Sequence, residues 1–266
     1  MRTKFVAFAL VAAAAMFGPA AASIAAAETI EVGAYPANPP WENKKADGSF
    51  EGFEVDMVNE IGKRLGATMH IQDLGFQALF AATSSGRIDM AISSISINND
   101  RLKNQAFTQP YYNSDIALVT NKDSKIKSLE DMKGQPVGAI STSSGEAWIK
   151  ANQEKYGFGD YKGYNTQEDL ILDTQNQRVA GSIGDIAGFQ FAFTKMPQMK
   201  VAQVITTGDT YGIMLKKGSP LLEKVNDAIT AMKKDGTLAA IHKKWLGVDP
   251  DPSTTTVKVM DIPKAQ

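Results

Sequence analysis

Short β-branched segments alternate with amphipathic helical segments along most of this chain, and this pattern limits its possible folds strongly. The segment 29–34 (TIEVGA) predicts a strand, and the segment 54–65 repeats its apolar residues at the spacing of one helix face. Further strands are expected at 68–71, 88–92, 116–120 and 136–140, and further helices at 76–84 and 144–155. The alternation predicts an α/β fold in which parallel sheets are flanked by helices.

Hydroxyl residues mark several of the expected helix starts. Thr166 and Ser128 each stand three residues before an aspartate, the spacing at which a side-chain oxygen caps a helix. Ser219 precedes Pro220, and proline is favoured in the first turn of a helix. These three positions therefore predict helix starts near residues 128, 166 and 219.

A weak internal repeat relates two parts of the chain. The segments 87–94 (RIDMAISS) and 178–185 (RVAGSIGD) share the pattern R-[I/V]-x-x-x-I-[S/G]-polar. In this register Ser94 matches Asp185, and each is the first polar residue beyond an expected strand. Ligands of open α/β sheets bind at the carboxyl ends of strands. The repeat therefore predicts two similar lobes that face one cleft; the alternative is a coincidence between two common helix–strand units.

Composition excludes several classes of function. The 266 residues include no cysteine, which excludes disulfides, iron–sulfur clusters, thiolate zinc sites and a cysteine nucleophile. Only two histidines occur, His70 and His242, and their separation argues against a histidine-rich metal site or a histidine-based catalytic triad. The formal net charge is −1, without a long basic run, which argues against nucleic acid as a partner. We therefore expect no metal and no cofactor.

The first 27 residues have the features of a secretory signal peptide. Arg2 and Lys4 precede an apolar stretch over 5–17, and Ala25 and Ala27 form a small-residue cleavage site. The apolar stretch is too short to span a bilayer comfortably. Cleavage is therefore predicted after Ala27, followed by export to the periplasm; the alternative is a retained membrane anchor.

Three polar residues follow the strand expected at 88–92. Ser94 and Ser96 share one face if the segment stays extended, and Arg101 comes after a turn-like Asn-Asn-Asp. An arginine beside hydroxyl groups can bind a carboxylate through two parallel hydrogen bonds. The alternative is a solvated surface arginine beside Asp100.

A second polar group follows the strand expected at 136–140. Ser143 and Ser144 belong to a run of four hydroxyl residues at an expected helix start, where free amides and the helix dipole can bind an anion. Simple capping of the helix by either serine is the alternative. Asp185 can hold an ammonium group, and its alternative role is the cap of a helix over 186–193.

Aromatic residues lie in or next to loops that follow the expected strands. Tyr35, Trp41, Phe53 and Phe76 can each pack on the apolar body of a ligand. The alternative for each is packing in the core or within its loop.

A series of short motifs resembles the solute-binding proteins of polar-amino-acid ABC importers over roughly residues 28–247. Each motif is weak alone, but their order and spacing together are specific. The matching segments are 52–56 (GFEVD), 86–89 (GRID), 96–101 (SINNDR), 107–112 (FTQPYY), 126–134 (IKSLEDMKG), 137–138 (VG), 143–146 (SSGE), 184–185 (GD), 211–213 (YGI), 234–237 (KDGT) and 244–245 (KW).

The resemblance implies an α/β fold of the type II periplasmic-binding-protein kind, with two α/β lobes joined by two hinge strands. It places 28–114 and 210–247 in lobe 1 and 115–209 in lobe 2, and leaves 248–266 as a polar C-terminal tail. It also implies roles for nine residues. These are Arg101, Ser96, Ser143 and Ser144 for the ligand α-carboxylate, Asp185, Ser94 and Ser96 for its α-ammonium group, Phe76 for its body, and Tyr35 and Asn38 for its side-chain pocket.

The implied function is capture of one free amino acid by hinge closure and its delivery to an ABC permease in the inner membrane. The binding protein itself is expected to be a monomer and not an enzyme. Binders of basic amino acids and of some polar amino acids in this family often carry aspartate at the position of Tyr35, and Gly184 leaves space beside the site. We therefore expect a ligand with a neutral or polar side chain.

The alternative function is that of an exported dehydratase of the same fold, acting on a cyclic carboxylic acid. Such an enzyme needs a general acid in the cleft. The candidates for that acid are Glu42, Asp47, Glu51 and Glu146, and none of them belongs to a motif.

Overall fold

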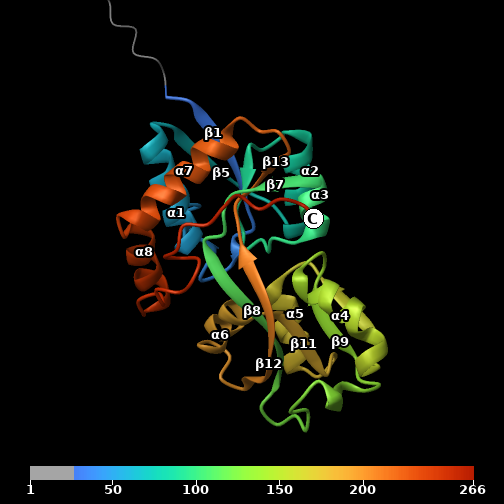
Figure 1. Cartoon of the computed structure of the whole chain (residues 1–266). Helices are drawn as coiled ribbons and strands as arrows, with labels where there is room; N and C mark the ends of the chain where they lie inside the picture. The colour runs from blue at the N-terminus through green and yellow to red at the C-terminus, as the bar shows by residue number, and fades with distance from the viewer. Residues whose placement is uncertain (1–26) are drawn as a thin grey trace, which may run out of the picture.

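The computed structural model describes residues 27–266, so the predicted signal peptide up to residue 26 lies outside the described residues. The described chain forms two α/β lobes, which two long adjacent strands connect (Figure 1). We call the part around the first sheet lobe 1 and the part around the second sheet lobe 2. No helix among the described residues is both long and apolar enough to cross a membrane.

Lobe 1 contains a five-stranded sheet of order β5-β1-β6-β13-β7 and a small sheet β2-β3-β4. Strand β1 runs parallel to β5 and β6, whereas β13 runs antiparallel to β6 and β7. The bounds are β1 Thr29–Ala34, β2 Ala37–Asn38, β3 Glu42–Lys44, β4 Phe50–Glu51, β5 Thr68–Asp73, β6 Met90–Ala91, β7 Gln105–Phe107 and β13 Met214–Lys216.

Lobe 2 contains a five-stranded sheet of order β10-β9-β11-β8-β12. Strand β9 runs parallel to β10 and β11, and β8 runs antiparallel to β11 and β12. The bounds are β8 Tyr112–Asn121, β9 Val137–Ile140, β10 Tyr161–Tyr164, β11 Gly181–Asp185 and β12 Met199–Tyr211.

The expectation of parallel sheets holds only in part, because each sheet combines parallel and antiparallel pairs. The chain leaves lobe 1 along β8 and returns along β12, so these two strands must run in opposite directions. Their pairing extends from Tyr112 opposite Tyr211 to Asn121 opposite Met199, with two irregularities in register. The returning chain then adds β13 antiparallel to its neighbours in lobe 1. The predicted strand 88–92 is also shorter than expected, since β6 covers two residues.

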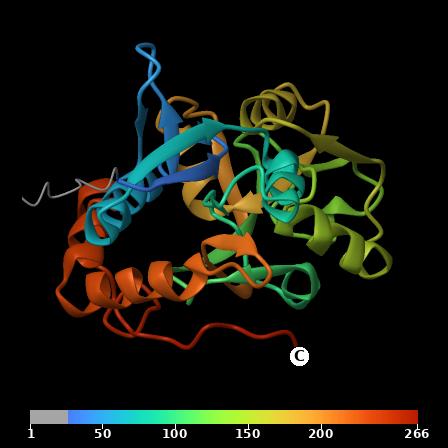
Figure 2. The same ribbon diagram turned by 90° about the horizontal axis from the view of Figure 1, so that it is seen from above.

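Helices cover both faces of both sheets (Figures 1 and 2). Those predicted at 54–65, 76–84 and 144–155 correspond to α1, α2 and α4 within one residue at each end. The bounds are α1 Phe53–Leu65, α2 Phe76–Ser85, α3 Asn99–Asn104, α4 Ser144–Tyr156, α5 Gln167–Gln175, α6 Ile186–Phe193, α7 Leu221–Lys234 and α8 Thr237–Leu246, with a 3-10 turn at Glu130–Met132.

The predicted caps are formed in two of three cases. The Thr166 hydroxyl accepts the amide of Asp169 at 3.1 Å and caps α5. The Ser219 hydroxyl accepts the amide of Leu221 at 3.3 Å at the start of α7. At Ser128 the expected hydrogen bond from the Asp131 amide to the serine hydroxyl is not formed. The Asp131 carboxylate instead accepts the Ser128 amide at 3.0 Å. Only the 3-10 turn follows there, so the expected helix is absent.

Apolar side chains fill the spaces between helices and sheets in both lobes. In lobe 1 one cluster joins β1 to α1 and α7 through Val32, Val58 and Ile229, all fully buried. A second lobe 1 cluster packs α2 against the opposite sheet face. In lobe 2 Ile149 of α4 and Leu170 of α5 belong to separate clusters on the two faces of the sheet. These packed apolar clusters fix the positions of the strand ends, and the cleft residues project from those ends.

The polar tail expected at 248–266 packs along lobe 1 (Figure 2). Thr256 is 2% exposed, and its hydroxyl donates to the carbonyl of Tyr111 at 3.0 Å. The amide of Thr255 donates to the Asn113 side chain at 2.7 Å, at the lobe 1 end of β8. The tail therefore contacts the segment that leads into the connecting strands.

Candidate ligand-binding cleft

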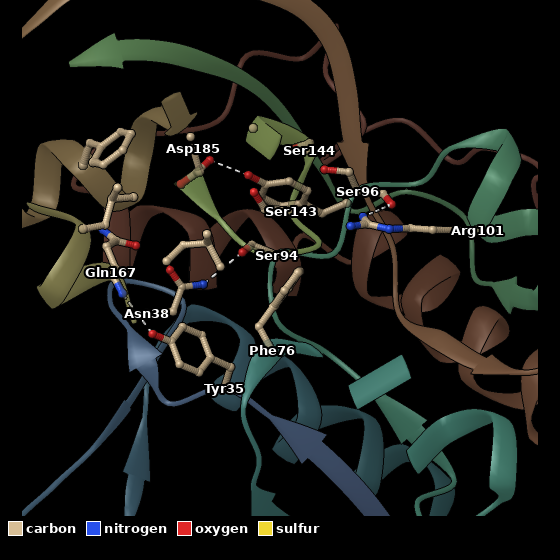
Figure 3. Close-up of a pocket in the computed structure, with 16 residues that line it drawn as sticks. Tyr35, Asn38, Phe76, Ser94, Ser96, Arg101, Ser143, Ser144, Gln167 and Asp185 are labelled. Carbon is tan, nitrogen blue, oxygen red and sulfur yellow. Dashed lines mark hydrogen bonds between the residues drawn. The ribbon is translucent and has the colours of Figure 1, made fainter. Parts of the chain in front are cut away.

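A cavity of about 610 Å³, counting its open mouth, lies between the two lobes (Figure 3). All nine residues predicted for the site line this cavity. Lobe 1 contributes Tyr35, Asn38, Phe76, Ser94, Ser96 and Arg101, and lobe 2 contributes Ser143, Ser144 and Asp185.

The strand ends of both sheets bring these residues together. Ser94 follows β6 and Asp185 ends β11, so the two matched positions of the internal repeat face the same cavity. Tyr35 follows β1, and Ser143 follows β9. This placement agrees with the rule that open α/β sheets bind ligands beyond the carboxyl ends of their strands.

Arg101 lies in α3 and connects the two lobes. Its Nη1 donates to the Ser96 carbonyl at 2.7 Å, and its Nη2 donates to the Thr142 carbonyl of lobe 2 at 2.9 Å. The guanidinium carbon lies 5.0 Å from the centre of the Phe80 ring. Burial lowers the pKa of Arg101 to about 10, so the side chain remains a cation at neutral pH. The alternative pairing with Asp100 is not formed, because Asp100 contacts Lys103 at 2.7 Å.

The start of α4 presents hydroxyl and amide groups to the cavity. The Ser143 hydroxyl accepts the amide of Glu146 at 3.3 Å, so the predicted cap is formed. Thr142 has a φ of 65°, a left-handed conformation that is unusual for a β-branched residue. Gly145 is required by close approach, because a Cβ atom there would overlap the backbone carbonyl of Ile183. The helix start therefore packs directly on β11, next to Asp185.

The Asp185 carboxylate accepts hydrogen bonds from four donors. The Gly188 amide donates at 2.6 Å, which makes Asp185 the cap of α6 as the alternative interpretation held. Ser114 Oγ donates at 2.7 Å, Trp41 Nε1 donates at 3.2 Å from lobe 1, and the Tyr211 hydroxyl also donates. Asp185 therefore both caps α6 and lines the cavity.

The four aromatic candidates divide into two groups. Tyr35 and Phe76 line the cavity, and the Tyr35 hydroxyl accepts the backbone amide of Gln167 at 3.1 Å across the lobes. Trp41 and Phe53 are fully buried in the lobe 1 core, 5.5 Å apart in an edge-to-face arrangement. For these two the core alternative is correct, although the Trp41 indole still reaches Asp185.

Several residues of the cavity wall are not among those predicted from the sequence. Gln167 and Leu170 come from α5, Phe189 comes from α6, and Tyr211 ends β12. In the sequence Leu170 and Phe189 have the spacing of core residues, so no local signal distinguishes them. Tyr211 occurs in one of the matched motifs, which is the only sequence feature that points to it.

The charges of the cavity lie on separate lobes. Among the residues that line it, Arg101 is the single cation and Asp185 is the single anion. The remaining polar groups are hydroxyls and amides, including Asn38, whose Nδ2 donates to Ser94 Oγ at 2.9 Å. Such a site can hold a small dipolar ion, because each end of the ion meets a group of opposite charge. Within residues 27–266 no three potential metal ligands gather in one place.

Two α/β lobes that enclose one polar cleft define the class of two-lobed extracytoplasmic binding proteins. The chain belongs to the bacterial extracellular solute-binding proteins, family 3, whose sequence model matches residues 30–248. The predicted resemblance to binding proteins of amino-acid importers is confirmed by this match and by the relatives.

Relatives of this chain bind several amino acids. The L-cystine-binding protein TcyJ of Escherichia coli is 30% identical over 229 residues, which are 83% of this chain and 84% of that protein. An ancestral arginine-binding protein, solved with bound arginine, is 33% identical in sequence and superposes with a TM-score of 0.78. The match covers 82% of this chain and 98% of that protein. An ancestral arginine-binding protein solved with bound glutamine is 32% identical in sequence, with a TM-score of 0.78. The match covers 84% of this chain and 100% of that protein.

The dehydratase alternative is wrong. The relatives are binding proteins of transporters and not enzymes. The candidate general acids also lie away from the cavity wall. Glu42 is fully buried in lobe 1, and Glu146 pairs with Lys150 at 2.8 Å on α4.

Proposed function

We propose that this protein captures one free amino acid with a neutral polar side chain and delivers it to an ABC permease in the inner membrane. The observation that carries the proposal is the separation of charge in the cleft, with Arg101 on lobe 1 and Asp185 on lobe 2. An α-amino acid carries a carboxylate and an ammonium group on one carbon, and its burial requires a partner for each. The two lobes supply one partner each.

The remaining site residues complete the two ends of the ligand. Ser96 and the start of α4, with Ser143 and Ser144, assist the carboxylate beside Arg101. The carbonyl of Ser94 assists Asp185 with the ammonium group. Phe76 packs on the ligand body. These roles follow from the family resemblance, and the shared cavity supports them.

The side-chain end of the ligand meets neutral groups in this proposal. Tyr35, Asn38 and Gln167 present hydroxyl and amide groups there, and the Asp185 carboxylate already accepts four hydrogen bonds. A cationic side chain needs a carboxylate of its own when it is buried. The glutamine-bound ancestral structure shows that a related cleft accepts a neutral ligand.

The cellular setting follows from the N-terminal segment and the family. The signal peptide ends after Ala27, and the exported protein works in the periplasm as a monomer. Residues 28–114 and 210–247 move as lobe 1 and residues 115–209 move as lobe 2, with the tail 248–266 carried on lobe 1. Closure of the lobes on the ligand presents the loaded form to the permease.

A thermal-shift screen over the twenty L-amino acids and L-cystine tests the proposed function. A ligand that binds only the native state raises the melting temperature. We expect the largest shift from an amino acid with a neutral polar side chain, and a much smaller shift from the same compound without its ammonium group. A larger shift with arginine, lysine or histidine would contradict the proposed specificity, and no shift with any amino acid would contradict the function.

A further inference from the structure

Two carboxyl groups are buried side by side behind the wall of the cleft. Glu42 comes from β3 and Glu54 from the first turn of α1, and both side chains are 0% exposed. Each carboxyl group shifts the pKa of the other, so the two groups lie close together. The titratable groups around the pair are Tyr35 and Tyr111 of lobe 1 and Asp185 of lobe 2. The binding roles described above do not use this pair.

Glu54 holds the backbone of a predicted site residue. Its two oxygens accept the amide of Ser94 at 2.9 and 3.1 Å, and one of them also accepts the Tyr111 hydroxyl. Ser94 has a φ of 44°, in the left-handed region that residues other than glycine rarely adopt. The carboxylate therefore stabilises an unfavourable backbone conformation at the centre of the cleft. The Asn38–Ser94 hydrogen bond in Figure 3 extends this support to the cavity wall.

The proton of the pair belongs on Glu42. Ser93 and Asn38 lie near Glu42, but among the described residues neither oxygen of Glu42 accepts a well-formed hydrogen bond. Glu54 accepts Ser94 and Tyr111 and lies at the positive end of α1. Two adjacent buried carboxylates repel each other, so one of them keeps its proton. A protonated Glu42 donates to Glu54 and leaves one negative charge on the pair. Burial raises the pKa of Glu42, and repulsion by Glu54 raises it further.

We propose that Glu42 and Glu54 form a proton-sharing pair that holds Ser94 in position and keeps one fixed negative charge behind the ammonium end of the cleft. This inference rests on the proposed function, since it adds two positioning residues to the same site. The charge lies near Asp185, whose own negative charge raises the pKa of Glu54. It adds to the charge of Asp185, which four protein donors already share.

Carbon-13 NMR of the glutamate side-chain carboxyl groups tests the shared proton without any ligand. We expect one carboxyl resonance that is still protonated at neutral pH in the wild-type protein and is absent from Glu42→Gln. A glutamine at position 42 imitates the protonated acid, because its amide donates to Glu54. Ionisation of every glutamate at neutral pH would overturn the proposal, whether or not the protein binds amino acids.

Ligand affinity tests the charge, with L-glutamine and its analogue without the amino group, glutaramic acid, as probes. Glu42→Gln keeps one charge on the pair, and we expect both dissociation constants to stay within about twofold of wild type. The double variant Glu42→Gln with Glu54→Gln removes the charge and nearly keeps the side-chain volumes. The remaining Oε1 of a glutamine at position 54 can still accept the Ser94 amide and the Tyr111 hydroxyl, although the second acceptor oxygen is lost. In it we expect L-glutamine to bind about tenfold more weakly or worse, with no loss for glutaramic acid.

If the double variant loses affinity equally for both probes, its effect is structural. That result would overturn the proposed role of the negative charge in binding the ammonium group. If the wild-type protein binds neither probe, L-glutamine is not its ligand, and the same measurements use the amino acid found in the screen and its analogue without the amino group. The NMR experiment tests the shared proton independently of any ligand.

Discussion

Arg101 connects the cleft to both lobes through a single side chain. Its guanidinium donates to one carbonyl on each lobe and lies against the Phe80 ring, so its position is set before any ligand carboxylate arrives. Preorganisation of this kind reduces the entropy that binding must overcome. Arg101 therefore gives the sharpest test at the scale of one residue.

We expect Arg101→Ala to lower amino-acid affinity by two to three decades, about 3–5 kcal/mol, because the ligand carboxylate loses its buried partner. Isothermal titration calorimetry with the amino acid found in the screen measures the change. Arg101→Lys keeps the charge without the fork of donors and should lie in between. Arg87→Ala, at an exposed position, is the matched control. Wild-type affinity in Arg101→Ala would contradict the assigned role.

Lys233 is a buried lysine, and none of the carboxylates within residues 27–266 forms an ion pair with it. Its ammonium group donates to Gln109 Oε1, the Pro110 carbonyl and the Lys258 carbonyl at 2.7–2.9 Å. Burial lowers the pKa of Lys233 from 10.5 to about 7. Between these values the unfolded chain binds more protons than the folded chain, so the contribution of Lys233 to stability rises with pH over that range.

Denaturant unfolding of the wild type and of Lys233→Met across this pH range tests the effect. As the pH rises from about 7 towards 10.5, we expect the free energy of unfolding of the wild type to increase relative to that of the variant. The difference between the two proteins isolates Lys233 from the other titrating groups. Parallel pH profiles would show that its pKa is the same in both states.

At the scale of an element, the C-terminal tail contributes to lobe 1 although the matched family region ends at residue 248. Thr255 bonds to Asn113 at the start of β8, Thr256 bonds to Tyr111 just before it, and the Met260 amide donates to Gln109 Oε1 at 3.0 Å. The Lys258 carbonyl is also one of the three acceptors around Lys233. The tail therefore completes the burial of that lysine.

We expect a chain that ends at residue 248 to lose about 2 kcal/mol of stability or more, from several hydrogen bonds of about 1 kcal/mol each. Exposure of Lys233 should also restore its ordinary pKa and abolish the pH effect described above. Urea unfolding at two pH values measures both results. Unchanged stability in the shortened chain would mean that the tail only rests on the surface.

At the scale of the whole molecule, the contacts between the lobes gather around the cleft. Arg101 reaches the Thr142 carbonyl, the Gln167 amide reaches Tyr35, and the Trp41 indole reaches Asp185. A ligand that bridges Arg101 and Asp185 adds contacts available only when the lobes meet. It therefore shifts the population towards the closed arrangement.

Small-angle X-ray scattering tests this closure. We expect the radius of gyration to fall when the amino acid found in the screen is added, towards the value calculated for the arrangement described above. Tyr35→Phe removes one contact between the lobes and should weaken binding by up to about tenfold. An unchanged radius of gyration would mean that binding does not depend on hinge closure.

The sequence by itself determined the local elements and the chemical groups of the cleft. Helical periodicity and caps predicted α1, α2 and α4 within one residue, because these signals act between near neighbours. The repeat placed Ser94 and Asp185 beyond strand ends, and both line one cavity. The order of the short motifs predicted the family, which the match over residues 30–248 confirms.

Only the tertiary structure decided the features that depend on distant segments. The antiparallel pairing of β8 and β12 follows from passage of the chain between lobes, which strand patterns do not record. Gln167 and Tyr211 join the wall only because the lobes meet. Glu42 resembled a cleft acid in the sequence, yet it is buried beside Glu54. Burial and charge pairing are properties of the packed chain, so no local pattern specifies them.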